Sequence, residues 1–413
     1  MRFGLFYELQ LPRPWQPDSE LRIVHETLEQ IELADRLGFD YAWAVEHHFL
    51  EEYSHCSAPE ILLSAASQRT QRIRLGHGIT VLPPGINPTA RVAERIGMLD
   101  LMSNGRVEFG TGESSTEVEL GAFGVDFSTK RAQWREAIDV VTRMFVEEPF
   151  AGHEGTYVHM PPRNVVPKPL QKPHPPLWAA CSKRESLSHA ARHGLGALTF
   201  SFVAPEEARK WVGDYYATIE SEECVPAGFS VNPQVAMTLY LMCDEDEATA
   251  RERGLADHRF FARSLAYYWG LGAHVPGKST LARDLGLDEP KDVVNREFPR
   301  VLEGAYSGIG TPEQIKKTLR EYEAAGVDQI LLVAQSGRIK HEHICASMEL
   351  FAREVMPEFA ERHESKELAK MQRLAPAIEA ALARRPPARR MDPEYRVRRT
   401  AMPSVSPRSA AKS

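Results

Sequence analysis

The 413-residue chain has few cysteines, and none of them form a pattern that builds a disulfide framework or a zinc site. The five cysteines are odd in number and widely spaced, without a C-x-x-C pair; they are Cys56, Cys181, Cys224, Cys243 and Cys345. Disulfide scaffolds and structural zinc sites use closely spaced pairs. We therefore expect free thiols in a reducing compartment.

The sequence also lacks a long apolar run, a leader segment and a strong excess of one charge. No run of about 18 apolar residues occurs, and Met1 leads into an apparent strand without a charged and apolar leader before it. The formal net charge of −7 argues against nucleic acid as the main partner. These absences predict a soluble, cytoplasmic protein that binds neither nucleic acid nor membrane.

Neither common nucleotide-binding motif is present. The segment Gly110-Thr111-Gly112 begins like G-x-G-x-x-G, but Ser115 stands where the third glycine belongs, and no P-loop occurs. The sequence therefore predicts no dinucleotide domain.

The chain does contain a regular alternation of short apolar segments and amphipathic segments. Such an alternation predicts parallel strands joined by right-handed helical crossovers. The predicted strands are residues 2–7, 39–45, 73–82, 106–110, 177–181, 198–202, 235–243 and 329–334. Eight such units predict an α/β fold of the (β/α)8 TIM barrel type.

Two segments interrupt the alternation, and one follows it. Residues 150–167 predict a hairpin excursion, and residues 248–309 predict a helical insertion before the last strand. We predict a barrel domain over residues 1–360 and a basic, Pro/Arg/Ser-rich tail over residues 361–413. Residues 366–385 have the composition of an isolated Ala-rich helix, and the rest of the tail is predicted to be disordered. Both a solvated tail and a segment that binds an acidic partner or a membrane surface fit this composition.

Glu46, His47 and His48 directly follow the second predicted strand. Active sites of TIM barrels lie at the carboxyl ends of the strands, and imidazole can donate or accept a proton near neutral pH. Neighbouring side chains of an extended chain point in opposite directions, so this pair is poorly placed to bind one metal ion. We expect no metal site. A buried structural histidine pair is the alternative.

The segment from Trp43 to Phe49, WAVEHHF, resembles the second-strand signature of the luciferase-like, flavin-dependent monooxygenases. Three further segments resemble this family in the same order: LGHGITVLP at 75–83, LDLMSNGR at 99–106 and PLWAA at 176–180. The segment GTPE at 310–313 is similar to the start of the family's penultimate helix. The resemblance covers residues 1 to about 360 and implies a (β/α)8 barrel that binds reduced FMN or a deazaflavin coenzyme.

The resemblance also implies roles for particular residues. The first histidine of the pair is catalytically essential in the luciferases, which implies this role for His47, with Glu46 and His48 beside it. The family often has a non-proline cis peptide under the flavin ring, which implies one between Gly78 and Ile79. A β-bulge with glycine for bending is the alternative explanation of these two residues.

Lys130 and Arg131 resemble the family's basic phosphate contact, and Arg131 matches it best. A phosphate dianion needs a cation and fixed hydrogen-bond donors. Further donors are expected from Cys181, Ser182 and Ser186, where the fifth strand turns into its helix. A solvated helix start is the alternative for the two basic residues.

One residue departs from the family pattern. Gly112, which we predict to contact the cofactor, is followed in the luciferases by an arginine near the phosphate. The residue here is Glu113, followed by Ser114 and Ser115, whose hydroxyls are the available substitutes. This departure argues against light emission.

The resemblance predicts a two-component monooxygenase that uses molecular oxygen, reduced FMN from a separate reductase and a small organic substrate. Family members commonly form dimers, which implies a homodimer. A deazaflavin-dependent oxidoreductase that transfers hydride and a non-catalytic flavin-binding barrel are the alternatives. The aromatic group Tyr267, Tyr268 and Trp269 has the composition of an apolar substrate pocket, but also of plain core or an oligomer contact.

Overall fold

The structure is a computed structural model that describes residues 1–200, 202–271, 275–284 and 307–397. Eight parallel strands form a closed barrel in the order β1-β12-β9-β8-β7-β4-β3-β2. The strands are β1 (Arg2–Tyr7), β2 (Tyr41–Ala44), β3 (Arg74–Val81), β4 (Val107–Gly112), β7 (Leu177–Cys181), β8 (Gly196–Thr199), β9 (Val235–Tyr240) and β12 (Gln329–Val333). The predicted TIM barrel is confirmed, and each predicted strand overlaps one strand of the barrel.

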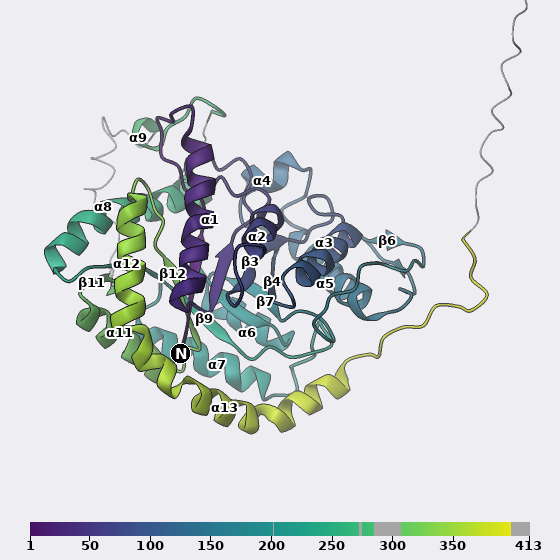
Figure 1. The fold of residues 1–413 in the computed structure, drawn as a ribbon. Helices are drawn as coiled ribbons and strands as arrows, with labels where there is room; N and C mark the ends of the chain where they lie inside the picture. Colours follow the sequence, from purple (N-terminus) through teal and green to yellow (C-terminus); the bar gives the residue numbers. More distant parts are fainter. Residues whose placement is uncertain (201, 272–274, 285–306, 398–413) are drawn as a thin grey trace, which may run out of the picture.

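Helices cover the outside of the barrel (Figure 1). They are α1 (Ser19–Leu37), α2 (Pro59–Ser67), α3 (Thr89–Met102), α5 (Lys130–Val146), α6 (Arg184–Arg192), α7 (Pro205–Ile219), α11 (Pro312–Ala324) and α12 (His341–Glu354). The short helix α4 (Glu117–Ala122) instead lies at the carboxyl ends of the strands, after β4. Gly38 ends α1 with a φ of 90°, and its N–H donates to Ala34 O at 3.0 Å. Glycine adopts this left-handed conformation without the steric strain that a Cβ would cause, which is why glycine commonly ends helices.

The barrel interior is a packed core. The rings of Trp43 and Trp178 are almost fully buried and meet at a centroid distance of 5.4 Å and an angle of 82°. Gly76 on β3 lies under the ring of Trp43, since a Cβ at this position would come within 2.1 Å of it. Side chains therefore fill the barrel, as in other barrels of eight strands, and here two tryptophan rings contribute to the filling.

The two predicted interruptions are present. Strands β5 (His153–Glu154) and β6 (His159–Met160) form the antiparallel hairpin. The insertion contains α8 (Glu247–Ala266), the π-helical turn η1 (Tyr267–Leu271) and α9 (Leu281–Asp284). Residues 272–274 and 285–306 of the predicted insertion lie outside the described residues. The short strands β10 (Met242–Cys243) and β11 (Ile309–Gly310) pair beside the barrel.

The chain after residue 360 differs from the expected isolated tail. One helix, α13 (Met356–Arg384), crosses the predicted boundary and runs along one end of the barrel (Figure 1). This is the amino-terminal end of the strands, because Lys370 Nζ lies 2.8 Å from a carboxylate oxygen of Asp328, which directly precedes β12. Leu374 and Ala381 are fully buried, so an apolar stripe among polar residues holds α13 in place. Residues 398–413 lie outside the described residues.

Candidate active site

A cavity of about 870 Å³ opens at the carboxyl ends of the barrel strands, and its size is typical of small-molecule sites. We call it the mouth cavity. Most of the predicted site residues line it: Glu46, His47, Gly78, Ile79, Gly112, Lys130, Arg131, Cys181 and Ser182. The structure therefore brings residues from four different strand ends to one place, as expected of a barrel active site.

His47 lies between two buried carboxylates. Its Nδ1 is 3.0 Å from Glu119 Oε1, and its Nε2 is 3.8 Å from Glu8 Oε2. Burial alone would lower the pKa of His47, but the negative charges of Glu119 and Glu8 outweigh burial and raise this pKa to about 9. The imidazole therefore carries a proton at neutral pH.

Glu119, on α4, fixes the ring of His47 from behind. Its carboxylate accepts hydrogen bonds from His48 N at 2.9 Å, Ser114 Oγ at 2.8 Å and Thr116 Oγ1 at 3.0 Å. Burial opposes ionisation, but the charge of His47 and these donors lower the pKa of Glu119 to about 2. Glu119 is therefore a permanent anion that orients the imidazole.

Glu8 directly follows β1 and is buried on the opposite side of the imidazole. Tyr53 Oη donates to Glu8 Oε1 at 2.8 Å, whereas Oε2, which lies nearer His47, has no hydrogen-bond partner among the described residues. Burial raises the pKa of Glu8 to about 7, although the charge of His47 opposes the shift. A carboxyl group that titrates near neutral pH beside a protonated imidazole can exchange a proton with it.

His48 and Glu46 flank His47 at the end of β2 and support the site. His48 Nε2 is 3.1 Å from Glu46 Oε1, and the same carboxylate accepts from Val81 N at 2.9 Å and from Asn87 Nδ2 at 2.7 Å. Glu46 thereby ties the end of β2 to the end of β3. The two histidines have different partners, and His48 does not line the mouth cavity.

The cis peptide expected between Gly78 and Ile79 is not present, and this prediction is wrong. The cis bonds of the described residues all precede proline. The pairing of β3 with β4 instead shifts register between His77 and Thr80, which is the β-bulge considered as the alternative. A bulge bends the strand locally and places Gly78 and Ile79 in the cavity wall.

The two basic residues at the cavity rim already have partners. Arg131 Nη2 lies 3.0 Å from Glu113 Oε1, and Lys130 Nζ donates to Ser114 O at 2.7 Å. A phosphate at this position would have to compete with Glu113 for the guanidinium group. Glu113, the residue that departs from the family pattern, is therefore the ion-pair partner of the predicted phosphate contact, Arg131.

The turn from β7 into α6 contributes neutral groups. Burial raises the pKa of the Cys181 thiol to about 12, so this cysteine stays protonated. Ser186 Oγ accepts from the backbone N–H groups of Ser182 and Lys183, both at 3.1 Å, and so caps α6. Ser186 lines an adjoining cavity of about 120 Å³ and not the mouth cavity.

The aromatic group of the insertion divides between pocket and core. Trp269 lines the mouth cavity, with its ring perpendicular to that of His47 at a centroid distance of 5.5 Å. Tyr267 and Tyr268 are buried. The sequence offered a pocket and a core as alternative locations for this group. In the structure, Trp269 lies in the pocket and the two tyrosines lie in the core.

Sequence reasoning missed Glu8, Tyr53 and Glu119. Glu8 follows the first predicted strand as Glu46 follows the second, so the same end-of-strand rule would have found it. Thr116-x-x-Glu119 has the spacing of a capping box, which signals a helix start and not a functional carboxylate. Nothing in the sequence marks Tyr53.

Two negative findings apply to the described residues alone. Within these ranges, no group of three or more His, Cys, Asp and Glu side chains is arranged to hold a metal ion. No helix among them is long and apolar enough to cross a membrane.

The closed barrel is that of a TIM-barrel protein, and its cavity lies where TIM-barrel enzymes have their active sites. The family model of the luciferase-like monooxygenases matches residues 1–329. The chain belongs to the luciferase-like monooxygenase family.

Individual relatives agree with this assignment. The oxygenase component of flavin-dependent trigonelline monooxygenase from Acinetobacter baylyi is 26% identical over 369 residues, which are 87% of this chain and 96% of that protein. Limonene 1,2-monooxygenase from Rhodococcus erythropolis is 31% identical over 205 residues, which are 48% of this chain and 50% of that protein. The chain thus aligns with about half the length of this relative and of two further curated relatives.

Solved structures show the same barrel. Monooxygenase RslO1 from Streptomyces bottropensis has a TM-score of 0.71 and 27% identity, and the match covers 87% of this chain and 100% of that chain. Two more distant structures resemble the chain in fold alone. The oxygenating constituent of 3,6-diketocamphane monooxygenase from Pseudomonas putida, in complex with FMN, has a TM-score of 0.68 and 20% identity over 86% of this chain and 98% of that chain. The coenzyme F420 dependent tetrahydromethanopterin reductase from Methanopyrus kandleri has a TM-score of 0.61 and 22% identity over 87% and 99%.

Proposed function

We propose that the protein is the oxygenase component of a two-component monooxygenase that uses reduced FMN and molecular oxygen to oxidise a small organic substrate. The observation that carries the proposal is the position of His47 between the carboxylates of Glu8 and Glu119, in the mouth cavity of a chain from this family. The two-component arrangement is supported by the trigonelline relative, which is named as an oxygenase component.

The residues of the mouth cavity fit FMN. The side chain of Ile79 packs directly on Gly112, since a Cβ at position 112 would come within 2.5 Å of Ile79 Cδ1, and both residues line the cavity wall. Lys130, Arg131 and Ser182 supply a cationic and hydrogen-bonding edge for a phosphate. Reduced FMN would supply the two electrons with which one oxygen atom enters the substrate and the other leaves as water.

The protein's own groups manage protons and exclude water. Glu119 holds Nδ1 of His47, so the proton on Nε2 is the one that can be delivered. Glu8 can accept or return a proton at this nitrogen, and Tyr53 keeps the Glu8 carboxyl group in place. Trp269 lies against the imidazole, and we expect its ring to limit the access of water to this side of the site.

We also propose a homodimer that forms through α1, α2 and α3. These neighbouring helices expose large apolar side chains: Leu21, Ile61, Met98, Leu101 and Met102, of which Ile61 is 69% exposed. We propose these side chains as the contact surface between the two copies.

A deazaflavin-dependent oxidoreductase that transfers hydride is the second candidate. The ion pair between Arg131 and Glu113 favours it, because this pair lowers the positive charge available to the phosphate dianion of FMN. A non-catalytic flavin-binding barrel is the third candidate, and the charged arrangement around His47 argues against it.

Anaerobic fluorescence titration with reduced FMN and with a reduced deazaflavin coenzyme separates the first two candidates. We expect saturable binding of reduced FMN, followed by oxygen-dependent reoxidation of the bound flavin. Tight deazaflavin binding without FMN binding would overturn the proposal.

A substitution tests the role of His47. We expect His47→Ala to bind reduced FMN. The bound flavin should react with oxygen about 100-fold more slowly, which is the size of a general acid–base contribution. His55→Ala is a matched control, since His55 pairs with Glu20 and does not line the mouth cavity. Equal rates in His47→Ala and the wild-type protein would show that His47 is structural.

A further inference from the structure

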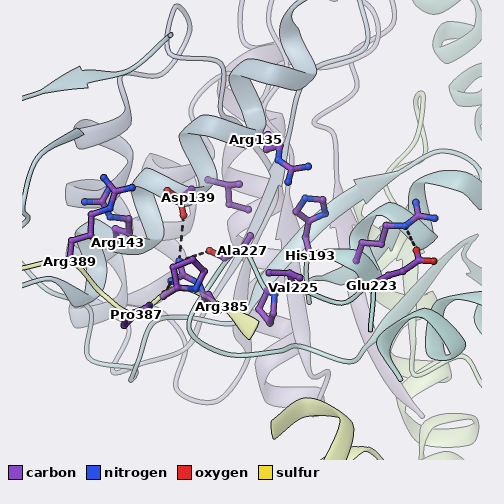
Figure 2. Close-up of a pocket in the computed structure, with 14 residues that line it drawn as sticks. Arg135, Asp139, Arg143, His193, Glu223, Val225, Ala227, Arg385, Pro387 and Arg389 are labelled. Atoms are coloured by element: carbon purple, nitrogen blue, oxygen red, sulfur yellow. Dashed lines mark hydrogen bonds and ion pairs between the residues drawn. The ribbon is translucent and has the colours of Figure 1, made fainter. Parts of the chain in front are cut away.

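A second cavity, of about 480 Å³, lies on the outside of the barrel, between α5, α6 and the chain that follows α13 (Figure 2). We call it the arginine cavity after five of its lining residues: Arg135, Arg143, Arg192, Arg385 and Arg389. None of the residues that line it also lines the mouth cavity. The arginine cavity is therefore separate from the candidate active site.

The arginine cavity carries an excess of positive charge. Three of its guanidinium groups have carboxylate partners: Arg143 lies 2.7 Å from Glu147, Arg192 lies 2.7 Å from Glu223, and Arg385 lies 3.6 Å from Asp139. Arg135 and Arg389 have no carboxylate partner among the described residues. Five arginines against three carboxylates leave an excess of two positive charges.

Part of this charge is held rigidly. The guanidinium group of Arg385 stacks on Phe229 at 3.6 Å from the ring centroid and donates to Ala227 O at 2.9 Å, and the latter bond is visible in Figure 2. The backbone N–H of Arg389 donates at 2.9 Å to the Glu147 carboxylate that also holds Arg143. The chain after α13 thus adds its own arginines to those of α5.

The charges of these arginines also act on His193. This buried residue lines the arginine cavity, and its Nδ1 lies 2.9 Å from His189 O. Burial and then the charges of Arg135 and Arg192 lower the pKa of His193, against the hydrogen bond to His189. The cavity therefore disfavours a further positive charge and favours an anion.

We propose that the arginine cavity binds a small organic dianion, namely a phosphate monoester or a dicarboxylate with an apolar body. Guanidinium groups bind the oxygens of both anions through paired N–H donors. The excess of two charges matches a dianion, and the cavity exceeds the size of the anionic group alone. Ile138, Val225 and Pro387 supply apolar wall for the remainder. Arg385 and Arg389 lie beyond the family-matched residues 1–329, so the site depends on the C-terminal extension of this chain.

Isothermal titration of the full-length protein tests the proposal with three probes: phenyl phosphate, phthalate and, as a neutral analogue, benzyl alcohol. We expect saturable binding of at least one dianion and none of benzyl alcohol. Arg135→Gln and Arg389→Gln each remove one exposed guanidinium group that has no carboxylate partner in the described part of the chain. Each variant should bind the dianion at least about tenfold more weakly, the loss expected for a charge-assisted hydrogen bond.

Arg184→Gln is the matched control, because Arg184 lies on α6, as Arg192 does, but lines neither the arginine cavity nor the mouth cavity. We expect this variant to bind the dianion as the wild-type protein does. Binding that survives in Arg135→Gln/Arg389→Gln and is lost in Arg131→Gln would belong to the mouth cavity, which Arg131 lines, and would overturn the proposal. A wild-type protein that binds neither dianion would also overturn it.

Discussion

The substitution Glu8→Gln tests whether the charge of Glu8 raises the pKa of His47. Glu8→Gln keeps the size of the side chain and removes a negative charge 3.8 Å from His47 Nε2. Two full charges at this distance attract by about 4 kcal/mol at an effective dielectric constant of 20, which equals about three pKa units. Glu119 still holds the imidazole, so we expect a smaller change. The pKa of His47 should fall from about 9 by at least about one unit.

The direction of the change follows from the charges. In the wild-type protein, His47 is protonated at neutral pH and loses its proton as the pH rises through about 9. In Glu8→Gln, the same loss occurs at a lower pH. A step that needs the His47 proton therefore slows at a lower pH in the variant. NMR titration of 15N-labelled histidines measures the pKa directly, and His47→Asn identifies the signal.

Glu20→Gln provides the matched control, since it removes a carboxylate that pairs with His55 and does not line the mouth cavity. The pKa of His47 should be the same in this variant and in the wild-type protein. An unchanged pKa in Glu8→Gln as well would mean that Glu119 alone sets the charge. This result would refute proton exchange between Glu8 and His47.

Three further substitutions test the cofactor contact, the C-terminal helix and the oligomeric state. Glu113→Gln frees Arg131 and should tighten the binding of reduced FMN about tenfold in fluorescence titration; an unchanged affinity would mean that the phosphate does not use Arg131. Leu374→Ala should lower the free energy of unfolding, measured in urea, by about 2–5 kcal/mol. Leu368 is 61% exposed on the same helix, so Leu368→Ala should change this free energy by less than about 0.5 kcal/mol. Equal effects of the two substitutions would contradict the packing of α13. Ile61→Glu should halve the mass measured by light scattering, and a wild-type mass would exclude a dimer contact through this part of α2.

Local sequence patterns were sufficient for the barrel but only for part of the site. Apolar segments of strand length and the glycine at position 38 act locally, so the strands and the end of α1 could be predicted. Glu119 acts on His47 across 72 positions of the chain, and only the closed barrel brings α4 to the end of β2. The packing of the C-terminal helix against the barrel could not be predicted for a related reason. Leu374 and Ala381 are sparse apolar residues in a polar, Ala-rich helix, and their burial depends on a surface that the barrel alone provides.

The Arg131–Glu113 pair bears on how the cofactor is used. A phosphate that must compete with a carboxylate for its guanidinium partner binds less tightly than one that meets a free cation. Under the proposed function, weaker binding suits the protein, because reduced FMN would arrive from a reductase and oxidised FMN would leave in each turnover. Glu113 would then promote exchange of the cofactor, at the position where the luciferases carry an arginine. Glu113→Gln should therefore slow the release of oxidised FMN in stopped-flow fluorescence, by about the same factor as it tightens binding, because affinity changes act mainly on the dissociation rate. A release rate equal to that of the wild-type protein would refute this role for Glu113.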